Sequence, residues 1–351
     1  MLTQIAPSDL VQVPNAPAGF VFRRFRGETD FPRMAALVNA ISLAYQHEYI
    51  QNVDELANDY AHLVNCDLAT DFLFVETEAP GTDGRDVAYC RVWWDEELDG
   101  LRRYLVVLNV HPDFRQPSDL ERALLHWAEA RLRAIAAAHP ADVAKVLQFW
   151  VSSSDLDQDR TALLESEGYT AVRWGYLMRR DLAEPIEERA LPAGLTARAP
   201  RPDEYRQVWD ALQEAFRDHW GFRPNTESEY EGWLTSPTFD ASLWQVAFAP
   251  GANGHGEEVA GMVLNFIPRE ENEALGLKRG WTDPICVRRP WRKLGVAKAL
   301  ILRSLELLKA QGLTEAALGV DTQNPNGALQ LYESCGFRPM RRSANYRKPL
   351  D

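Results

Sequence analysis

The stretch that decides the fold runs from residue 285 to residue 297 and reads Ile285-Cys286-Val287-Arg288-Arg289-Pro290-Trp291-Arg292-Lys293-Leu294-Gly295-Val296-Ala297. It predicts an apolar strand that ends at Val287, a basic loop, and a helix that begins near Gly295. Small and apolar residues then recur at helical spacing and predict one buried helix face, formed by Ala297, Leu300, Ile301, Ser304, Leu305 and Leu308. Gly312 is a typical end for that helix.

A strand, a loop and a helix in this order can create an anion site. Backbone N–H groups at the helix start have no acceptor within the helix, and the positive end of the helix dipole lies behind them. Gly295 allows close approach of a phosphate, the small Ala297 avoids a clash, and Arg292 and Lys293 add positive charge. The loop lacks both G-x-G-x-x-G and G-K-[ST], which argues against a dinucleotide fold and excludes a P-loop. A purely structural corner is the alternative.

A second informative stretch reads Val320-Asp321-Thr322-Gln323-Asn324-Pro325-Asn326-Gly327-Ala328-Leu329-Gln330-Leu331-Tyr332-Glu333-Ser334-Cys335-Gly336-Phe337. It predicts a strand that ends near Asp321 and a short helix that Asn324 or Asn326 can cap and that ends at Gly336. Helical spacing places Tyr332 on the inward face. An inward tyrosine, taken alone, is more often a core residue than a catalytic one.

Together these two stretches resemble the GNAT acyltransferase superfamily. The run from Arg292 to Ala297 matches its [RQ]-x-x-G-x-[GA] acyl-CoA signature, and the Asn-containing loop followed by Ala-x-x-Leu-Tyr-Glu-x-x-Gly-Phe matches its second motif. The resemblance covers roughly residues 195–351. It implies an acetyltransferase that takes acetyl-CoA as co-substrate and transfers the acetyl group to a primary amine of a small molecule or peptide. A non-catalytic acyl-CoA-sensing or scaffold protein is the alternative.

The resemblance also implies roles for individual residues. The strand that enters the first motif splays from its neighbour, pantetheine pairs with the strand's backbone, and the diphosphate lies on the amides of the loop. The expected cofactor-binding residues are Ile285, Cys286, Val287, Arg292, Lys293, Leu294, Gly295, Val296, Ala297, Asn324 and Asn326. Tyr332 would donate a proton to the CoA sulfur.

Aminolysis of a thioester makes two further demands. A free amine with a pKa of ~10.4 is mostly protonated at neutral pH, so a base or a water relay must take its proton. Asp283 is the first candidate for the base, and a plain turn residue before Pro284 is an equally good interpretation. A backbone N–H on the splayed strand, at Val287, can face the developing oxyanion.

The acceptor site is predicted where the first helix of this half ends. Asp218, His219 and Trp220 follow one another there, and in GNAT folds this region forms a wall of the acceptor pocket. A histidine, an acid and an indole can hold a polar or cationic acceptor. The alternative is a helix C-terminus at which His219 interacts with the dipole and Trp220 packs.

The chain also repeats itself at an offset of about 168 to 175 positions, as Leu163-Leu164-Glu165-Ser166-Glu167-Gly168-Tyr169 and Leu331-Tyr332-Glu333-Ser334-Cys335-Gly336-Phe337 illustrate. Each copy is predicted to be an α/β unit with a mixed, mostly antiparallel sheet flanked by helices and closed by a hairpin. The predicted organisation is an N-terminal arm (1–15), a degenerate GNAT-like domain (16–180), a linker (181–192) and a catalytic GNAT domain (193–351). Gly-rich turns at 79–84 and 249–254 mark equivalent hairpins.

The N-terminal copy departs from the acyl-CoA signature. Arg115 occupies the arginine position, but the two small-residue positions hold Ser118 and Leu120, Pro117 removes a backbone donor, and Leu164 takes the place of the tyrosine. We therefore expect this copy to have lost acyl-CoA binding. Tandem members of the superfamily, mycothiol synthase among them, keep activity in the C-terminal copy. Nothing in the residues singles out mycothiol as the product, so that assignment is a minor alternative.

Composition narrows the function further. A formal net charge of −13 argues against a nucleic-acid partner, because phosphate contacts need a basic face. Four dispersed cysteines predict neither a disulfide framework nor a metal site. No apolar run approaches the ~20 residues of a membrane span, and the N-terminus lacks the pattern of a signal peptide. The expectation is a cytoplasmic protein, monomeric or homodimeric, that requires no metal.

Overall fold

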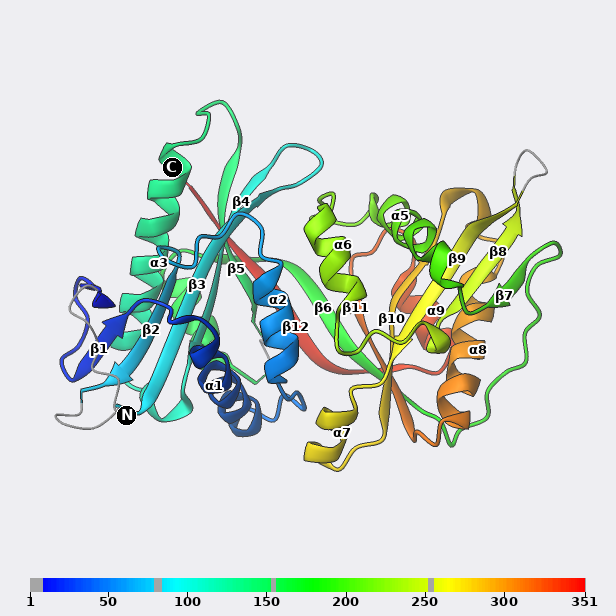
Figure 1. Cartoon of the computed structure of the whole chain (residues 1–351), viewed down its shortest axis with the longest axis horizontal. Helices are drawn as coiled ribbons and strands as arrows, with labels where there is room; N and C mark the ends of the chain where they lie inside the picture. The colour runs from blue at the N-terminus through cyan, green and yellow to red at the C-terminus, as the bar shows by residue number, and fades with distance from the viewer. Residues whose placement is uncertain (1–8, 79–83, 153–155, 252–255, 351) are drawn as a thin grey trace. The chain divides into compact units, whose positions relative to one another are not determined.

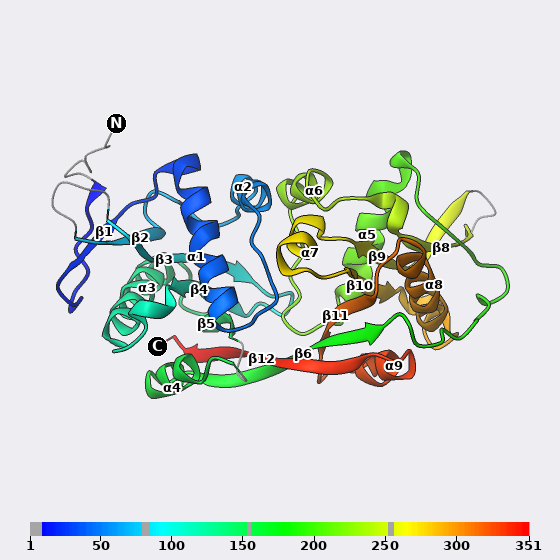
Figure 2. The same ribbon diagram turned by 90° about the horizontal axis from the view of Figure 1, so that it is seen from below.

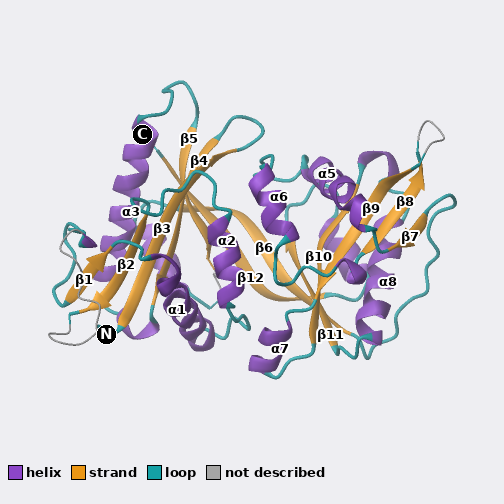
Figure 3. Cartoon of the chain, viewed as in Figure 1, coloured by secondary structure: helices purple, strands orange, loops and turns teal. Residues whose placement is uncertain are grey.

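The computed structural model describes residues 9–78, 84–152, 156–251 and 256–350 (Figures 1, 2 and 3). The chain forms two compact units, one of residues Met1–Val172 and Ala344–Asp351 and the other of residues Arg173–Ser343. Residues 1–8 of the predicted arm, and parts of both predicted Gly-rich turns, lie outside the described residues. Leu10 of the arm forms a bridge with Arg23.

The first unit is an α/β structure with a mixed sheet. Its strands follow one another in the sheet in the order β1 (Phe20–Arg23), β2 (Phe72–Thr77), β3 (Asp86–Glu96), β4 (Arg102–Val110), β5 (Lys145–Ser152) and the final part of β12 (Arg338–Pro349). Only the β4–β5 pair among these neighbours is parallel. The helices of this unit are α1 (Phe31–Ala44), α2 (Val53–Ala61), α3 (Asp119–Ala137) and α4 (Gln158–Ser166).

The second unit has the same architecture. Its strands follow one another in the order β7 (Thr196–Arg198), β8 (Gln245–Pro250), β9 (Glu257–Phe266), β10 (Arg279–Val287), β11 (Glu315–Asp321) and β6 (Thr170–Asp181). Here only β10 and β11 pair in parallel. Its helices are α5 (Tyr205–Phe216), α6 (Glu227–Leu234), α7 (Arg269–Leu275), α8 (Val296–Ala310) and α9 (Ala328–Ser334).

One-turn 3₁₀ helices precede several elements: η2 (Gly27–Asp30), η3 (Pro112–Phe114), η4 (Pro202–Glu204), η5 (Ala241–Leu243) and η6 (Arg289–Trp291). Apart from η5 and α7, which have no counterpart among the described residues of the first half, the two halves run through the same order of strands and helices. This order confirms the predicted duplication of an α/β fold with a mixed, mostly antiparallel sheet.

The last strand of each half does not close a hairpin, so that prediction is wrong. Strand β6 pairs with β11, from Gly175 opposite Asp321 to Asp181 opposite Glu315. Strand β12 pairs with β5. The two units therefore divide within β6 and β12, and the predicted linker, 181–192, lies inside the second unit. The hairpin prediction failed because an apolar strand pattern specifies which face of the strand is buried but does not specify the strand with which it pairs.

The helix predicted after Gly295 is α8, and its predicted face forms the core of the second unit. Leu300, Ile301, Leu305 and Leu308 are fully buried, and α8 packs on β8, β9 and β10. Burying a side chain of this size contributes roughly 1.5–3 kcal/mol. This packing fixes the first turn of α8 beside the end of β10, where the candidate site lies.

Candidate acyl-CoA site

The site begins where two parallel strands separate. Strand β10 pairs with β11 only from Arg279 to Trp281. Beyond that point β11 continues along β6 to Asp321, while β10 continues along β9 to Val287 after an irregular step between Thr282 and Ile285. The two strands therefore open into a V, which is the splay that the family resemblance implies.

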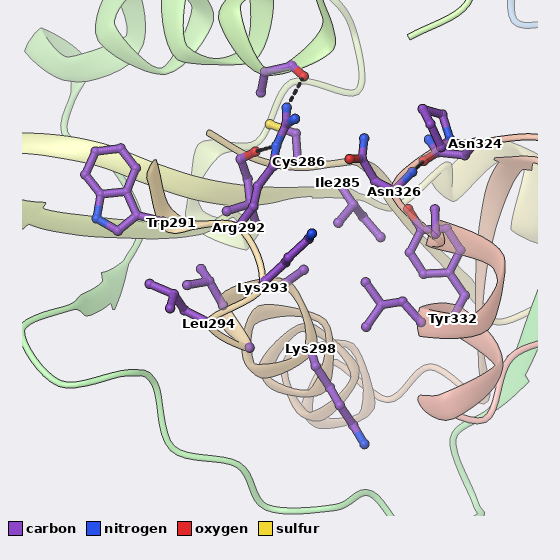
Figure 4. Close-up of a pocket in the computed structure, with 18 of the residues that line it drawn as sticks. Ile285, Cys286, Trp291, Arg292, Lys293, Leu294, Lys298, Asn324, Asn326 and Tyr332 are labelled. Carbon is purple, nitrogen blue, oxygen red and sulfur yellow. Dashed lines mark hydrogen bonds between the residues drawn. The ribbon is translucent and has the colours of Figure 1, made fainter. Parts of the chain in front are cut away.

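A cavity of about 600 Å³ lies at this opening (Figure 4). All the expected cofactor-binding residues line it: Ile285, Cys286, Val287, Arg292, Lys293, Leu294, Gly295, Val296, Ala297, Asn324 and Asn326. Tyr332 also lines it, together with residues that were not among those expected to bind the cofactor: Arg189, Ala215, Trp291, Lys298, Pro325, Ala328 and Leu331.

The loop between β10 and α8 has the backbone shape that an anion site needs. Lys293 and Gly295 both have a positive φ, of 64° and 87°, and Gly295 is the N-cap of α8 without a side-chain cap. The first amides of α8 therefore have no acceptor within the helix, and the helix dipole adds positive potential. The Lys293 side chain extends from this loop toward the cavity (Figure 4).

Arg292 has a different role from the one expected. Its Nε donates to the Val287 carbonyl at 3.0 Å, Nη1 to Asp218 at 2.6 Å, and Nη2 to the Ala215 carbonyl at 3.0 Å. The guanidinium thus turns away from Lys293 toward α5 (Figure 4). Three of the N–H groups of Arg292 are thus paired with protein acceptors, so Arg292 holds the loop in place at the edge of the cavity that it lines.

Tyr332 has the properties of a proton donor. Its side chain is 7% exposed, and burial, followed by the charge of Asp283, raises the pKa of its hydroxyl well above the usual value. The hydroxyl is therefore protonated at neutral pH. Among the described residues it has no hydrogen-bond partner, so the proton is available to a bound molecule.

Asp283 lies in the irregular step of β10, half-buried beside Gly319 of β11. Burial raises the pKa of its carboxyl to about 6, against a smaller opposing effect of the Gly319 N–H. A carboxylate that titrates near neutral pH suits a general base.

The Val287 amide points to the open side of β10. The Arg288 N–H donates to the Ala260 carbonyl of β9 at 3.0 Å. Successive amides of a strand point to opposite sides, so the Val287 N–H faces away from β9. It faces the side of β10 on which the strand separates from β11.

Of the three residues expected at the acceptor site, only His219 lines the cavity. Asp218 forms ion pairs with Arg289 and Arg292, which lower the pKa of its carboxyl. Trp220 lies under the Arg173 guanidinium, 5.6 Å from the ring centroid. His219 packs on Phe216, with ring centroids 4.2 Å apart, and burial lowers the pKa of its imidazole.

Two details of the second motif also differ from expectation. The N-cap of α9 is Gly327, with φ of 71°, so neither asparagine caps the helix. Instead, the Asn324 Oδ1 accepts from the Asn326 N–H at 2.8 Å and shapes the loop that borders the cavity. Lys298, which is in the first turn of α8, could have been found from its position one turn after Gly295. Arg189 carried no sequence signal, because its segment lacks periodicity.

In the equivalent loop of the first unit, the arginine at the signature position forms ion pairs within the unit. Arg115 is fully buried and donates from Nη1 to Asp157 at 2.9 Å and from Nε to Glu121 at 3.2 Å. Arg160 donates to the same Glu121 at 2.7 Å. Two carboxylates therefore neutralise the arginine that occupies the signature position, and Arg115 serves the stability of this unit.

First-turn amides beside splayed strands, with a buried tyrosine across the cavity, are the features of an acyl-CoA-dependent transferase. The sequence profile of the acetyltransferase (GNAT) family matches residues 205–337. The chain is 31% identical over 244 residues to a mycothiol acetyltransferase of Salinispora tropica, covering 69% of this chain and 72% of the relative. It is 31% identical to one of Streptomyces scabiei, covering 69% and 70%.

Solved structures of GNAT proteins share the fold of this chain. A GCN5-related N-acetyltransferase from Sphaerobacter thermophilus superimposes with a TM-score of 0.68 at 26% identity, covering 95% of this chain and 96% of that one. A tandem GNAT protein from the clavulanic acid biosynthesis pathway shares the fold, with a TM-score of 0.61 at 17% identity over 95% and 99%. The chain therefore belongs to the GNAT acetyltransferase family and is an enzyme that uses an acyl-CoA donor and an amine acceptor.

None of the helices within the described residues is long and apolar enough to cross a membrane. The same residues contain no cluster of histidine, cysteine, aspartate and glutamate that could hold a metal ion.

Proposed function

We propose that this enzyme transfers an acetyl group from acetyl-CoA to a primary amine of a small molecule or peptide, and that the second unit carries the reaction. The observation that carries this proposal is the cavity in which the splayed end of β10, the Gly295 turn and Tyr332 meet. In this cavity the β10 backbone would bind the pantetheine, the Gly295 turn would bind the diphosphate, and Tyr332 would lie at the leaving sulfur.

In the proposed reaction, the acceptor nitrogen attacks the thioester carbonyl carbon while the Asp283 carboxylate removes a proton from that nitrogen. The Val287 N–H donates to the carbonyl oxygen as it becomes negative. The C–S bond then breaks, the amide forms, and Tyr332 protonates the departing thiolate. Desolvation keeps the Tyr332 hydroxyl protonated until the sulfur departs, and it moves the pKa of Asp283 to about 6, so that this carboxyl can accept a proton at neutral pH.

His219 is the proposed acceptor contact. It lines the cavity, and burial keeps its imidazole neutral at physiological pH. A neutral imidazole can accept a hydrogen bond from an incoming amine or hydroxyl group. Asp218 and Trp220 would act indirectly, by holding Arg292 and Arg173.

Calorimetric titration with acetyl-CoA, followed by a thiol-release assay across a panel of amines, tests this function. We expect one binding site per chain, because Arg115 is neutralised within its own unit. We also expect free thiol to appear with at least one amine. Two sites per chain, or binding without thiol release for every amine, would contradict the proposal.

A second candidate is acetylation that yields mycothiol, because the matched relatives carry the name mycothiol acetyltransferase. The amine that gives mycothiol on acetylation therefore belongs in the panel. A kcat/KM for it well above that of every other amine would favour this candidate. We also propose a cytoplasmic location, which the four free cysteines and the acyl-CoA donor support. The proposed state of the enzyme is a monomer or a homodimer.

A further inference from the structure

The segment between β6 and β7 is held against the cofactor end of the second unit. Arg180, almost fully buried at the end of β6, donates from Nε to the Cys335 carbonyl at 3.1 Å and from Nη2 to the Pro185 carbonyl at 2.8 Å. Ile186 and Leu191 pack on the hydrophobic core of the same unit. These contacts determine the path of residues 185–191.

This path brings Arg189 to the phosphate-binding turn. A Cβ placed on Gly295 would lie only 3.1 Å from Nη2 of Arg189, so the guanidinium rests on the glycine itself. Arg189 also lines the cavity. Its side chain is 42% exposed, which leaves donors free to reach a ligand. No other arginine in the cavity has that freedom, because Arg292 has three of its N–H groups paired with protein acceptors.

An acidic residue two positions earlier holds the other nearby cation. Oε2 of Glu187 lies 2.8 Å from Nζ of Lys298, in the first turn of α8, and its Oε1 lies 3.8 Å from Arg189. The ion pair with Lys298 lowers the pKa of the Glu187 carboxyl, so the carboxylate is charged at neutral pH. Without a ligand, the Lys298 ammonium is therefore paired with the Glu187 carboxylate.

We propose that Arg189 binds the diphosphate of the acyl-CoA, and that Glu187 pairs with Lys298 until the diphosphate replaces it. This inference rests on the proposed acetyl-CoA site. A guanidinium binds phosphate oxygens in a bidentate manner and matches the anion that the amides of the turn attract. The diphosphate carries more negative charge than one carboxylate, so it competes for Lys298. The segment predicted to be only a linker is thus part of the donor site.

Calorimetry on the full chain tests the role of Arg189. The ligands are acetyl-CoA, its 3′-dephospho form and acetyl-pantetheine, which lacks phosphates. We expect Arg189→Ala to weaken binding of the first two by about tenfold, the lower end for a charged hydrogen bond at a half-exposed site, and to leave acetyl-pantetheine unchanged. Arg206→Ala is the control: it removes an arginine of comparable exposure that pairs with Asp210 and Glu227 outside the cavity.

A second comparison tests Glu187. We expect Glu187→Gln to tighten acetyl-CoA binding several-fold in the natural chain, and to have no effect when Lys298→Met has removed the cation for which it competes. Equal melting temperatures for all variants would show that folding is preserved, and circular dichroism would identify any variant that does not fold.

The outcomes separate this inference from the proposed function. Normal binding by the natural chain with no difference between Arg189→Ala and Arg206→Ala would overturn the inference alone. So would a loss that persists with acetyl-pantetheine, or one that disappears with the 3′-dephospho ligand, which would assign Arg189 to the 3′-phosphate. Failure of the natural chain to bind acetyl-CoA would overturn the proposed function, and the inference with it.

Discussion

At the scale of single residues, the site depends on two groups whose environments disfavour charge. Burial raises the pKa of both Tyr332 and Asp283, yet the consequences differ. A phenol shifted upward stays protonated at all physiological pH values, whereas a carboxyl shifted to about 6 is deprotonated at pH 7.5. One environment therefore leaves the phenol protonated and the carboxyl deprotonated at the same pH, which are the two states that the proposed reaction requires.

Tyr332→Phe is expected to lower kcat strongly and to leave the Kd for acetyl-CoA nearly unchanged. Protonation of the sulfur belongs to the transition state, and positioned acid catalysis is typically worth ~10²–10⁴-fold. The melting temperature should hold, since the hydroxyl has no partner among the described residues. Near-normal turnover together with a stability loss of about 1 kcal/mol would instead indicate a structural tyrosine.

The pH dependence of kcat/KM tests Asp283. A base must be deprotonated to act, so the rate should fall as the pH drops through about 6, the raised pKa of this carboxyl. Asp283→Asn should lower the rate and remove that limb of the profile. His219→Ala should keep the limb and raise the KM for the amine. A limb that persists in Asp283→Asn would assign the base to another group.

The same pKa shift predicts an effect on stability. The folded-state pKa of Asp283 lies above its unfolded value, 3.8, so the contribution of the protonated form is complete below about pH 4 and lost as the pH rises through about 6. A shift from 3.8 to about 6 corresponds to at most about 3 kcal/mol. Asp283→Asn should therefore melt above the natural chain at pH 7.5, with a difference that shrinks toward pH 4.

At the scale of elements, the turn between β10 and α8 works through its backbone, and a pair of glycines tests this. Gly295 has φ of 87°, and a Cβ there would lie 3.1 Å from Arg189. Gly276, which ends α7, has φ of 65° and open space around its missing Cβ. Alanine at either position should cost about 1 kcal/mol of stability, but only Gly295→Ala should weaken acetyl-CoA binding, by tenfold or more. Equal affinities for the two variants would show that the turn does not contact the cofactor.

The sequence predicted the elements that carry a strong local pattern. The strand ending at Val287 and helix α8 follow from apolar spacing, and Gly295 was singled out because a phosphate needs close approach to the backbone. The motifs also located most of the cavity. The sequence could not predict which side chains pair with one another. Asp218 pairs with Arg289 and Arg292, which are more than seventy positions away. No local pattern shows that its carboxylate is already engaged in these ion pairs. Arg189 was missed for the same reason, because only the packing of Ile186 and Leu191 brings it to the turn.

At the scale of the whole molecule, duplication has produced two units that keep one fold and differ in chemistry. The first unit turns its signature arginine inward to Glu121 and Asp157, whereas the second keeps an open turn beside Lys293. The final strand of each half pairs with the penultimate strand of the other half. A boundary drawn from the repeat therefore cuts through the sheet of each compact unit.

Two truncated chains test this exchange of strands. A chain of residues 190–351 follows the sequence repeat but lacks β6, so β11 loses its antiparallel partner along its whole length, from Glu315 to Asp321. It also loses Met178, which is fully buried, and the hydrogen bonds of Arg180 to the Cys335 and Pro185 carbonyls. Burial of one such side chain is worth roughly 1.5–3 kcal/mol, a large part of a typical domain stability of about 5–15 kcal/mol.

A chain of residues 173–343 keeps the part of β6 that pairs with β11, Arg180 and every residue that lines the cavity. We expect it to unfold at a higher denaturant concentration than the chain of residues 190–351, and to bind acetyl-CoA where the other does not. Both chains contain both motifs, and the shorter N-terminus of the chain 190–351 removes residues 182–189, with Arg189, as well as β6. The denaturant midpoint therefore tests β6, and the chain 190–351 carrying no Arg189 is compared for binding with the Arg189→Ala variant of residues 173–343. If residues 190–351 proved equally stable and bound acetyl-CoA equally well, β6 would be dispensable to the catalytic unit, and the pairing with β11 would contribute little to its folding.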